Sequence, residues 1–379
     1  MKKSRILFLS DTFESNFLRD MPVMAKLLSE CGYDITWMSS TYLLGKIYDK
    51  NYFKKWDSKL MDIKVLRCKV INLSWLFRRG VIPYIPNLEL FRKYNLLHVY
   101  CLGSFSSFLG SIIRCLRNKI KMVITTDLDY LTFQRANKNF FYKNFILFPA
   151  KIADIVIAFS QKEKKNLINL GIKRGKIKVI PHGIYINKLK ICNKSIISNK
   201  IILGYIGKIK PIKGVCRLIS PISRILTENS DLVFMIIAGP EEDKDYSKKI
   251  LDSFHKFKNF NYWGSLNGKR VYEFYKTCDI ILIPSLSESY CLVALESMAA
   301  GKLVIASDIY PINEYIKHGE TGYLVKESEQ FYEYIKLLLI KPKIIETCGQ
   351  NAMKIVIKYS WKRCIKKVQN IYKELGIVI

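Results

Sequence analysis

Two glutamates in the second half of the chain have the type and spacing to hold a ligand rich in hydroxyl groups. Glu288 and Glu296 lie eight positions apart, and a carboxylate accepts hydrogen bonds from neighbouring hydroxyls. Eight helical positions span about 12 Å, which is the reach of a sugar, a diphosphate and a ribose laid end to end. Two glutamates at this spacing are, by themselves, usually solvated surface residues, so the elements around them decide the interpretation.

The stretch from Asp279 to Gly301 predicts a strand, a polar loop and a helix. Residues 280–283 are an all-apolar run closed by proline and serine, which is typical of a buried parallel strand that meets a turn. From Leu292 to Ala300 the apolar residues recur at helical spacing, and a glycine ends the pattern. Free backbone N–H groups at such a helix start bind an anion at the carboxyl edge of a parallel sheet. The residues expected to line this site beside Glu296 are Ser289, Tyr290, Cys291, Leu292 and Val293.

This stretch resembles the paired-glutamate signature of the retaining glycosyltransferases of family 4, which have the two-lobed GT-B architecture. The resemblance implies that Glu296 holds the ribose hydroxyls of a nucleotide-sugar donor and that Glu288 contacts the transferred sugar. The family usually has Glu-Gly-Phe-Gly, whereas this chain has Glu288-Ser289-Tyr290-Cys291. The missing second glycine, at Cys291, crowds a place where the backbone approaches phosphate and sugar. This departure affects the identity of the sugar more than the reaction class.

A second motif follows the apolar run 201–206, where residues 207–214 read Gly-Lys-Ile-Lys-Pro-Ile-Lys-Gly. It resembles the family's Gly-Arg, four residues, then Lys-Gly, in which both cations contact the donor diphosphate. Lys213 matches this pattern, and Lys208 replaces the arginine with a point charge that binds phosphate without bidentate geometry. The resemblance implies that both lysines act in catalysis with Glu288. Gly207 and Gly239, each at the end of a predicted strand, are expected to lie beside the donor.

The first half of the chain is expected to bind the acceptor. Residues 5–38 predict a strand-helix-strand opening that resembles the family's amino-terminal unit, but its loop, residues 11–17, lacks the family's two glycines. His98 on a predicted strand is more often a structural residue than a catalyst. Asp127 follows another predicted strand, where the family commonly places an acceptor-side histidine. It is either a catalytic residue at the acceptor site or a cap of the next helix.

The formal charge of +30 indicates a polyanionic partner, such as a nucleotide substrate, a nucleic acid or an anionic bilayer. The sequence is rich in Lys, Ile and Asn, as coding DNA rich in A and T would produce, and this explains part of the positive charge. It does not explain why lysine so outnumbers glutamate. Residues 42–94 interleave aromatic side chains with lysine and arginine, as residues 52–56 show. This pattern fits an anionic membrane surface, base stacking on nucleic acid or a structural core. We favour the membrane surface and expect no specific nucleic acid.

The cysteines and histidines argue against a metal site. The ten cysteines are scattered singly and there are only four histidines, which favours a reducing compartment. We therefore expect neither a metal nor a cofactor, and treat the nucleotide-diphosphate sugar as a substrate. The apolar run behind the basic N-terminus is short, and no segment reaches the roughly 18 uninterrupted apolar residues of a spanning helix. These features predict a cytoplasmic protein, either free or peripheral on the inner face of the cell membrane.

Strands alternate with helices in both halves of the 379 residues, which predicts an α/β protein with two doubly wound parallel sheets. The resemblance implies the GT-B fold, in which two Rossmann-like domains face a central cleft. Residues 1–183 form the expected acceptor-side domain, onto which the C-terminal helix 360–379 packs back. The polar, lysine-rich residues 184–200 form the expected hinge. Residues 201–359 form the expected nucleotide-sugar-binding domain.

Together with the resemblance, these features predict a hexosyltransferase that moves a sugar from a UDP- or GDP-sugar to a glycan or lipid-linked acceptor. The resemblance implies that the reaction retains the anomeric configuration and needs no metal. Two alternatives stay open. A GT-B nucleotide-sugar epimerase would need no acceptor. A non-enzymatic polyanion-binding protein with a degenerate GT-B fold would explain why Lys208, Cys291 and the missing glycines all depart from the family pattern.

Overall fold

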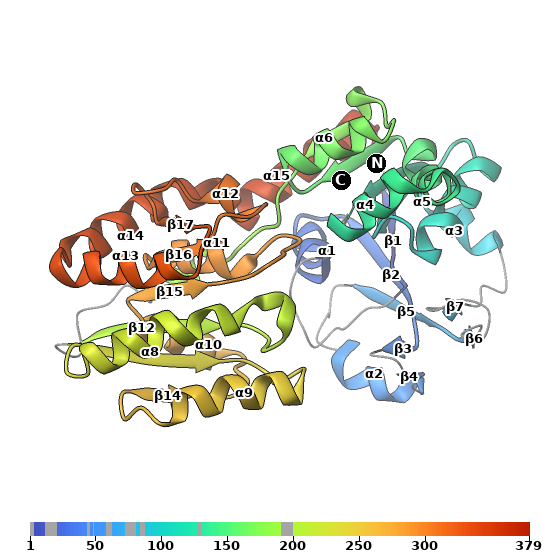
Figure 1. The fold of residues 1–379 in the computed structure, drawn as a ribbon. Coiled ribbons are helices and arrows are strands. Elements are labelled where there is room, and N and C mark those ends of the chain that lie inside the picture. The colour runs from blue at the N-terminus through green and yellow to red at the C-terminus, as the bar shows by residue number, and fades with distance from the viewer. Residues whose placement is uncertain are drawn as a thin grey trace. The chain divides into compact units, whose positions relative to one another are not determined.

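A computed structural model describes residues 4–11, 21–43, 46–47, 49–57, 63–72, 81–83, 88–126, 130–190 and 200–379. The chain divides into two compact units, one formed by Met1–Gly183 with Trp361–Ile379 and the other by Ile184–Ser360. Each unit contains a parallel sheet with helices packed on it (Figure 1). Parallel strands require crossover connections, which are usually helical, and the alternating pattern of the sequence supplies them. The predicted α/β class with two parallel sheets is confirmed.

The first unit contains a seven-stranded parallel sheet in the order β11-β10-β9-β8-β1-β2-β5. Its central strands are almost wholly apolar because helices cover both faces. The strands are β1 (Arg5–Leu9), β2 (Asp34–Ser40), β5 (Lys64–Cys68), β8 (Leu96–Tyr100), β9 (Lys121–Thr125), β10 (Ile155–Ala158) and β11 (Ile177–Val179). Two short antiparallel pairs are β3 (Tyr42–Leu43) with β4 (Lys46–Ile47) and β6 (Val70–Asn72) with β7 (Val81–Pro83). The helices are α1 (Met21–Glu30), α2 (Lys50–Asp57), α3 (Phe105–Leu116), α4 (Tyr130–Lys138), α5 (Phe140–Ile152), α6 (Gln161–Asn169) and α15 (Trp361–Glu374).

A buried histidine links the C-terminal helix α15 to the first sheet. His98 on β8 has no exposed surface, and its Nδ1 lies 2.6 Å from the Tyr372 hydroxyl of α15. Its Nε2 lies 2.7 Å from Thr125 Oγ1, so both ring nitrogens have partners. Burial lowers the pKa of His98 to about 3, and the ring is neutral in the folded protein. The prediction that His98 is a structural residue is confirmed.

Acid is expected to destabilise the first unit through His98. Its folded-state pKa of about 3 lies below the ordinary value of 6.5, so between these pH values the unfolded chain binds a proton that the folded chain does not. The free energy of unfolding therefore falls as the pH drops through this window, by at most about 1.4 kcal/mol per pH unit. His98→Gln should flatten this slope, whereas His255→Gln, at an exposed histidine, should not. Urea denaturation over the window measures it, and equal slopes for wild type and His98→Gln would contradict the assignment.

Part of the aromatic, basic region 42–94 belongs to the structural core. Phe53 is only 2% exposed, and the Arg67 guanidinium lies 4.0 Å from the centroid of its ring. Arg67 also forms an ion pair of 2.7 Å with Asp57. For these residues the structural interpretation is therefore correct, while residues 73–80 of the same region lie outside the described residues.

The second unit contains a six-stranded parallel sheet in the order β14-β13-β12-β15-β16-β17. The strands are β12 (Ile201–Ile206), β13 (Val233–Ala238), β14 (Phe260–Tyr262), β15 (Ile280–Ile283), β16 (Leu303–Ser307) and β17 (Tyr323–Val325). The helices are α7 (Ile186–Lys190), α8 (Ile219–Glu228), α9 (Lys244–His255), α10 (Lys269–Thr277), α11 (Leu292–Ala299), α12 (Ile312–Tyr315), α13 (Glu329–Ile340) and α14 (Lys343–Val356). The predicted strand 280–283 and the helix that starts at Leu292 are confirmed. Of the predicted hinge, residues 186–190 form α7, which packs against α11, and residues 191–199 lie outside the described residues.

The strand order of the second sheet reverses between β12 and β15. Leu203 and Gly204 of β12 pair with Ile280 and Ile281 of β15, although β13 and β14 lie between these two strands in the sequence (Figure 1). In doubly wound sheets, ligands bind at the carboxyl ends of the strands where the order reverses. The two loops that leave this point are the ones that carry Lys208, Lys213 and Glu288.

Candidate functional site

A glycine brings the loop after β12 against the end of β15. The 3-10 turn Pro211–Lys213 ends at Gly214, whose φ is +62°. A Cβ atom at this position would lie 2.2 Å from the carbonyl oxygen of Pro284, so only glycine permits the approach. The close contact between the two loops places Lys213 beside the loop that follows β15.

Lys213 and Glu288 form the central ion pair of the site. Lys213 Nζ lies 2.7 Å from Glu288 Oε2, and the two side chains are only 25% and 9% exposed. The hydroxyl of Ser285 donates to the other oxygen, Oε1, at 2.6 Å. Removing one partner of a buried pair leaves an uncompensated charge, which is strongly destabilising. The structure thus joins two residues that are 75 positions apart in the sequence.

Lys208 is held by a carboxylate that the sequence analysis did not identify. Its ammonium pairs with Glu242 Oε1, and Lys210 Nζ lies 2.9 Å from Glu242 Oε2. The hydrogen bond from Lys208 is the largest cause of the lowered pKa of Glu242. The Lys208 side chain is 54% exposed, and exposed pairs contribute little stability, so an anionic ligand can compete for this lysine. No motif marked Glu242, which follows the strand β13 and the Gly239-Pro240 turn.

Glu296 lies in the second turn of α11 and is oriented by a buried tyrosine. The hydroxyl of Tyr275, on α10, donates to Glu296 Oε2 at 2.9 Å, and Tyr275 has no exposed surface. Tyr275 could not be predicted from the sequence either, because it lies on another helix and in no recognised motif. Its hydrogen bond fixes the position of the carboxylate.

The start of α11 has the backbone conformation of a glycine at Cys291. This N-cap residue has φ +55° and ψ +65°, in the left-handed region that non-glycine residues rarely adopt. The family's glycine at this position is therefore explained by the backbone, and the cysteine here adds a side chain that is 7% exposed. Leu292 and Val293 begin the helix, where the first N–H groups have no partner within the helix. Their amides are suitably placed for an anion.

The other predicted residues of this loop differ in exposure. Ser289 is exposed, while Tyr290 is 6% exposed and its ring packs against Tyr315 at a centroid distance of 5.5 Å. The Tyr315 hydroxyl also donates to the Tyr290 carbonyl oxygen at 2.9 Å. Tyr290 thus supports the loop from within the core.

The Cys291 thiol lies within electrostatic range of Glu288, Lys213 and Glu296, but it is not a nucleophile. Burial, and then the negative charge of Glu288, raise the pKa of Cys291 well above its usual value, and the charges of Lys213 and Glu296 also act on it. A thiol with a raised pKa stays protonated and unreactive at neutral pH.

Gly207 and Gly239 touch each other at the ends of β12 and β13. Gly239 has φ +143°, and a Cβ atom there would lie 1.7 Å from the Gly207 carbonyl oxygen. The Gly207 N–H donates to the Ala238 carbonyl oxygen at 2.9 Å. The two glycines allow the neighbouring loops to meet beside the lysines.

Arg217, also not identified from the sequence, braces the carboxyl ends of three strands. Its guanidinium donates to the Pro284 carbonyl oxygen after β15 at 3.3 Å and to Ser307 Oγ at the end of β16 at 2.7 Å. It also donates to the Lys326 carbonyl oxygen after β17 at 2.6 Å. These bonds hold the loop that carries Glu288, because that loop starts at Pro284.

The acceptor side is described only in part. Asp127 and residues 12–17 lie outside the described residues. Asp11, at the end of β1, accepts from the backbone N–H groups of Phe105 at 2.9 Å and Ser106 at 2.7 Å. Its carboxylate therefore caps the start of α3.

Within the described ranges, no three or more histidine, cysteine or acidic side chains are grouped so that they could hold a metal ion. The cysteines in these ranges are free thiols. Among the helices of the described residues, none combines the length and apolar character needed to cross a membrane.

Solved structures share the fold over the whole chain. The Anabaena protein HepE, solved in complex with UDP and glucose, has a TM-score of 0.73 at 17% identity, with 98% of this chain and 100% of that chain covered. Sucrose-phosphate synthase from Thermosynechococcus elongatus has a TM-score of 0.74 at 17% identity, with 99% of each chain covered. Such identities establish the fold alone. The two parallel-sheet units of this chain have the GT-B fold that the resemblance implied.

Two family models cover most of the chain. The model described as Glycosyltransferase Family 4 matches residues 23–188, and the model described as Glycosyl transferases group 1 matches residues 188–355. The chain therefore belongs to the glycosyltransferases that combine a Family 4 domain with a group 1 domain. The predicted family and fold class are confirmed, and both models describe glycosyltransferases, as the sequence predicts.

Proteins similar in sequence include the lipopolysaccharide 1,2-N-acetylglucosaminetransferase of Salmonella typhimurium, which is 28% identical over 185 residues. That alignment covers 46% of this chain, and the chain spans about half, 49%, of the length of the Salmonella protein. An uncharacterised glycosyltransferase of Methanocaldococcus jannaschii is 26% identical over 326 residues, with 79% of this chain and 86% of that protein covered.

Proposed function

We propose that this protein transfers a hexose from a nucleotide-diphosphate sugar to a glycan or lipid-linked acceptor at the cytoplasmic face of a membrane, with retention and without a metal. The observation that carries the proposal is the partly buried Lys213–Glu288 ion pair at the strand reversal between β12 and β15. The pair supports the proposal because a cation that can bind phosphate and a carboxylate that can accept from sugar hydroxyls lie 2.7 Å apart. The names of the Salmonella N-acetylglucosaminetransferase and the UDP-bound Anabaena protein support a sugar-nucleotide donor.

In the proposed complex, the diphosphate binds the amides of Leu292 and Val293 at the start of α11. Lys208 and Lys213 neutralise its charge, because lysine is a mobile point charge that suits phosphate oxygens. Glu296, oriented by Tyr275, accepts hydrogen bonds from the ribose hydroxyls. The donor thereby runs along the first two turns of α11.

The bound diphosphate changes the partner of each lysine. It displaces Glu288 from Lys213 and Glu242 from Lys208, both of which pair with these cations in this structure. Glu288, still bound by Ser285, then accepts from hydroxyls of the hexose. The ion pairs therefore keep the lysines in position until the donor arrives.

The rate acceleration is proposed to come from charge stabilisation. As the glycosidic bond breaks, negative charge grows on the leaving phosphate, and Lys208, Lys213 and the helix start stabilise that state more than the ground state. These groups supply the positive charge that the reaction requires, so the proposed mechanism uses no metal. No carboxylate of the site is assigned as a nucleophile.

Donor binding tests the proposal through Glu296. Glu296→Gln replaces a charged hydrogen-bond acceptor with a neutral one of the same shape, and we expect the Kd for the nucleotide-sugar to rise about tenfold. Isothermal titration, after a thermal-shift screen of UDP- and GDP-sugars, measures it, with Glu273→Gln at an exposed glutamate of α10 as the matched control. The proposal fails if no nucleotide-sugar protects the wild type, or if both variants bind alike.

A further inference from the structure

Four exposed phenylalanines lie on one helix of the first unit. Phe140, Phe141, Phe145 and Phe148 of α5 are 73%, 84%, 60% and 40% exposed, and no other phenylalanine in the described part of the chain is exposed. Large apolar side chains are normally buried, and a contiguous exposed group of them marks an interaction surface.

Exposed apolar residues form one stripe on α5 and another on α3. Phe141, Phe145 and Phe148 recur at positions i, i+4 and i+7 and so lie on one face of α5. On α3, Ile112 and Leu116 are 51% and 66% exposed and recur at i and i+4. Helices α3 and α5 pack against each other, and Figure 1 shows them side by side with α4.

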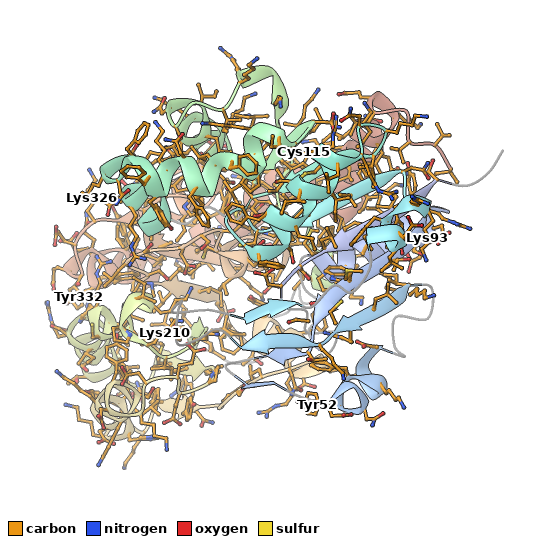
Figure 2. All side chains as sticks on the ribbon, turned by 90° about the vertical axis from the view of Figure 1, so that its right-hand side faces the viewer. Tyr52, Lys93, Cys115, Lys210, Lys326 and Tyr332 are labelled. Carbon is orange, nitrogen blue, oxygen red and sulfur yellow. The ribbon has the colours of Figure 1, made fainter. Side chains whose placement is uncertain are left out.

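Phe108 of α3 joins the two stripes. Its ring centroid lies 4.3 Å from that of Phe145 and 6.4 Å from that of Phe148. Figure 2 turns this side of the first unit toward the viewer, with Cys115 marking the end of α3 next to Leu116. We name the following six residues the phenylalanine surface: Phe108, Ile112, Leu116, Phe141, Phe145 and Phe148.

The three helices that carry and flank this surface have cations and no carboxylates. They contain five basic residues, Arg114, Arg135, Lys138, Lys143 and Lys151, and no aspartate or glutamate. Arg114 is engaged with Asp154 at 3.0 Å, whereas Arg135, Lys138 and Lys151 are exposed. Aromatic side chains bordered by cations alone are typical of helices that lie in the interface of an anionic bilayer.

We propose that the phenylalanine surface docks the protein on an anionic lipid bilayer. The rings of Phe141 and Phe145 enter the boundary between headgroups and acyl chains, and the lysines contact lipid phosphates. A protein partner or a second copy would also cover an apolar face, but an anionic bilayer best matches three helices whose charged side chains are all basic. The docking deepens the proposed function, because it rests on an acceptor at the membrane face. It assigns the membrane contact to α3 and α5, whereas Phe53 of the region 42–94 is buried.

Vesicle flotation of the full chain tests the docking. Phe141→Ser combined with Phe145→Ser removes the two most exposed rings of the phenylalanine surface, and we expect partition onto vesicles of phosphatidylcholine with phosphatidylglycerol to fall at least about tenfold. Wild type should bind vesicles of phosphatidylcholine alone more weakly, and added salt should reduce its binding to the anionic vesicles. The matched control combines Leu232→Ser with Ile340→Ser, at apolar residues of the second unit that are 52% and 75% exposed, and should float like wild type.

Three outcomes would overturn the docking. The first is that the wild type fails to float with anionic vesicles, and the second is that the Phe141/Phe145 double variant floats like the control. The third is that this variant loses self-association in sedimentation while its lipid partition is unchanged. Circular dichroism and thermal melting check that each variant is folded. Nucleotide-sugar protection is measured on the same samples without acceptor. Flotation that depends on the phenylalanine surface without any donor protection would support the docking and reject the proposed transfer reaction.

Discussion

Replacing Lys213 with alanine is expected to lower kcat/KM for sugar transfer about 10²–10³-fold, the usual cost of removing one preplaced donor to a developing negative charge. Lys213 is the less exposed of the two candidate phosphate-binding lysines, with 25% of its side chain exposed against 54% for Lys208. Its charge is therefore less screened by water and acts more strongly on the leaving phosphate. Sugar transfer from the donor found in the thermal-shift screen measures the effect.

The control for this variant is Lys210→Ala. Lys210 lies in the same loop and its ammonium pairs with Glu242, so we expect its removal to change kcat/KM less than about threefold. Lys213→Ala also leaves Glu288, which is 9% exposed, without its cation, and this lowers stability. Adding Glu288→Gln should restore the melting temperature without restoring transfer. Near wild-type turnover by Lys213→Ala, or recovery of activity in the double variant, would remove Lys213 from the catalytic site.

Gly239→Ala is expected to destabilise the second unit by at least about 3 kcal/mol. The added Cβ atom would lie 1.7 Å from the backbone oxygen of Gly207, far inside van der Waals contact. Backbone oxygen at a strand end cannot move aside as a flexible side chain can, so the strand ends must separate. Urea unfolding, followed by a probe in the second unit, measures the loss as a lower midpoint at unchanged slope.

Gly319→Ala separates steric overlap from backbone conformation. Gly319 also has a positive φ, +75°, but a Cβ atom there would meet no atom within 4 Å. It should lose only about 1 kcal/mol, the cost of the left-handed region for a residue with a side chain. Equal losses for the two variants would show that the contact between Gly207 and Gly239 is not what requires glycine at position 239.

The elements that carry the site could be predicted from local sequence. Strands such as Ile201–Ile206 and Ile280–Ile283 are short apolar runs between polar loops, and their bounds agree with the prediction. A buried parallel strand needs apolar residues on both faces, so the pattern is visible without any partner strand. The glutamates and lysines were identified in the same way, because each follows such a run in a family motif.

The partners of those residues could not be predicted, because they depend on strand order. Glu288 meets Lys213 only because β15 pairs with β12 rather than with β14, the strand that precedes it in the sequence. Arg217 and Tyr275 come from other helices and lie in no recognised motif. No surface could be predicted on the segments that form α3, α4 and α5, because exposed and buried phenylalanines look alike in a sequence.

The sequence by itself therefore determined the fold class, the family and the residues of the predicted donor site, since each depends on types and spacings within one segment. Only the tertiary structure decided that Glu242 holds Lys208, that Tyr275 orients Glu296 and that the phenylalanines of α5 are left uncovered. The physical reason is that ion pairs, hydrogen bonds and burial depend on which segments become neighbours, and that depends on the order of the strands and the packing of the helices.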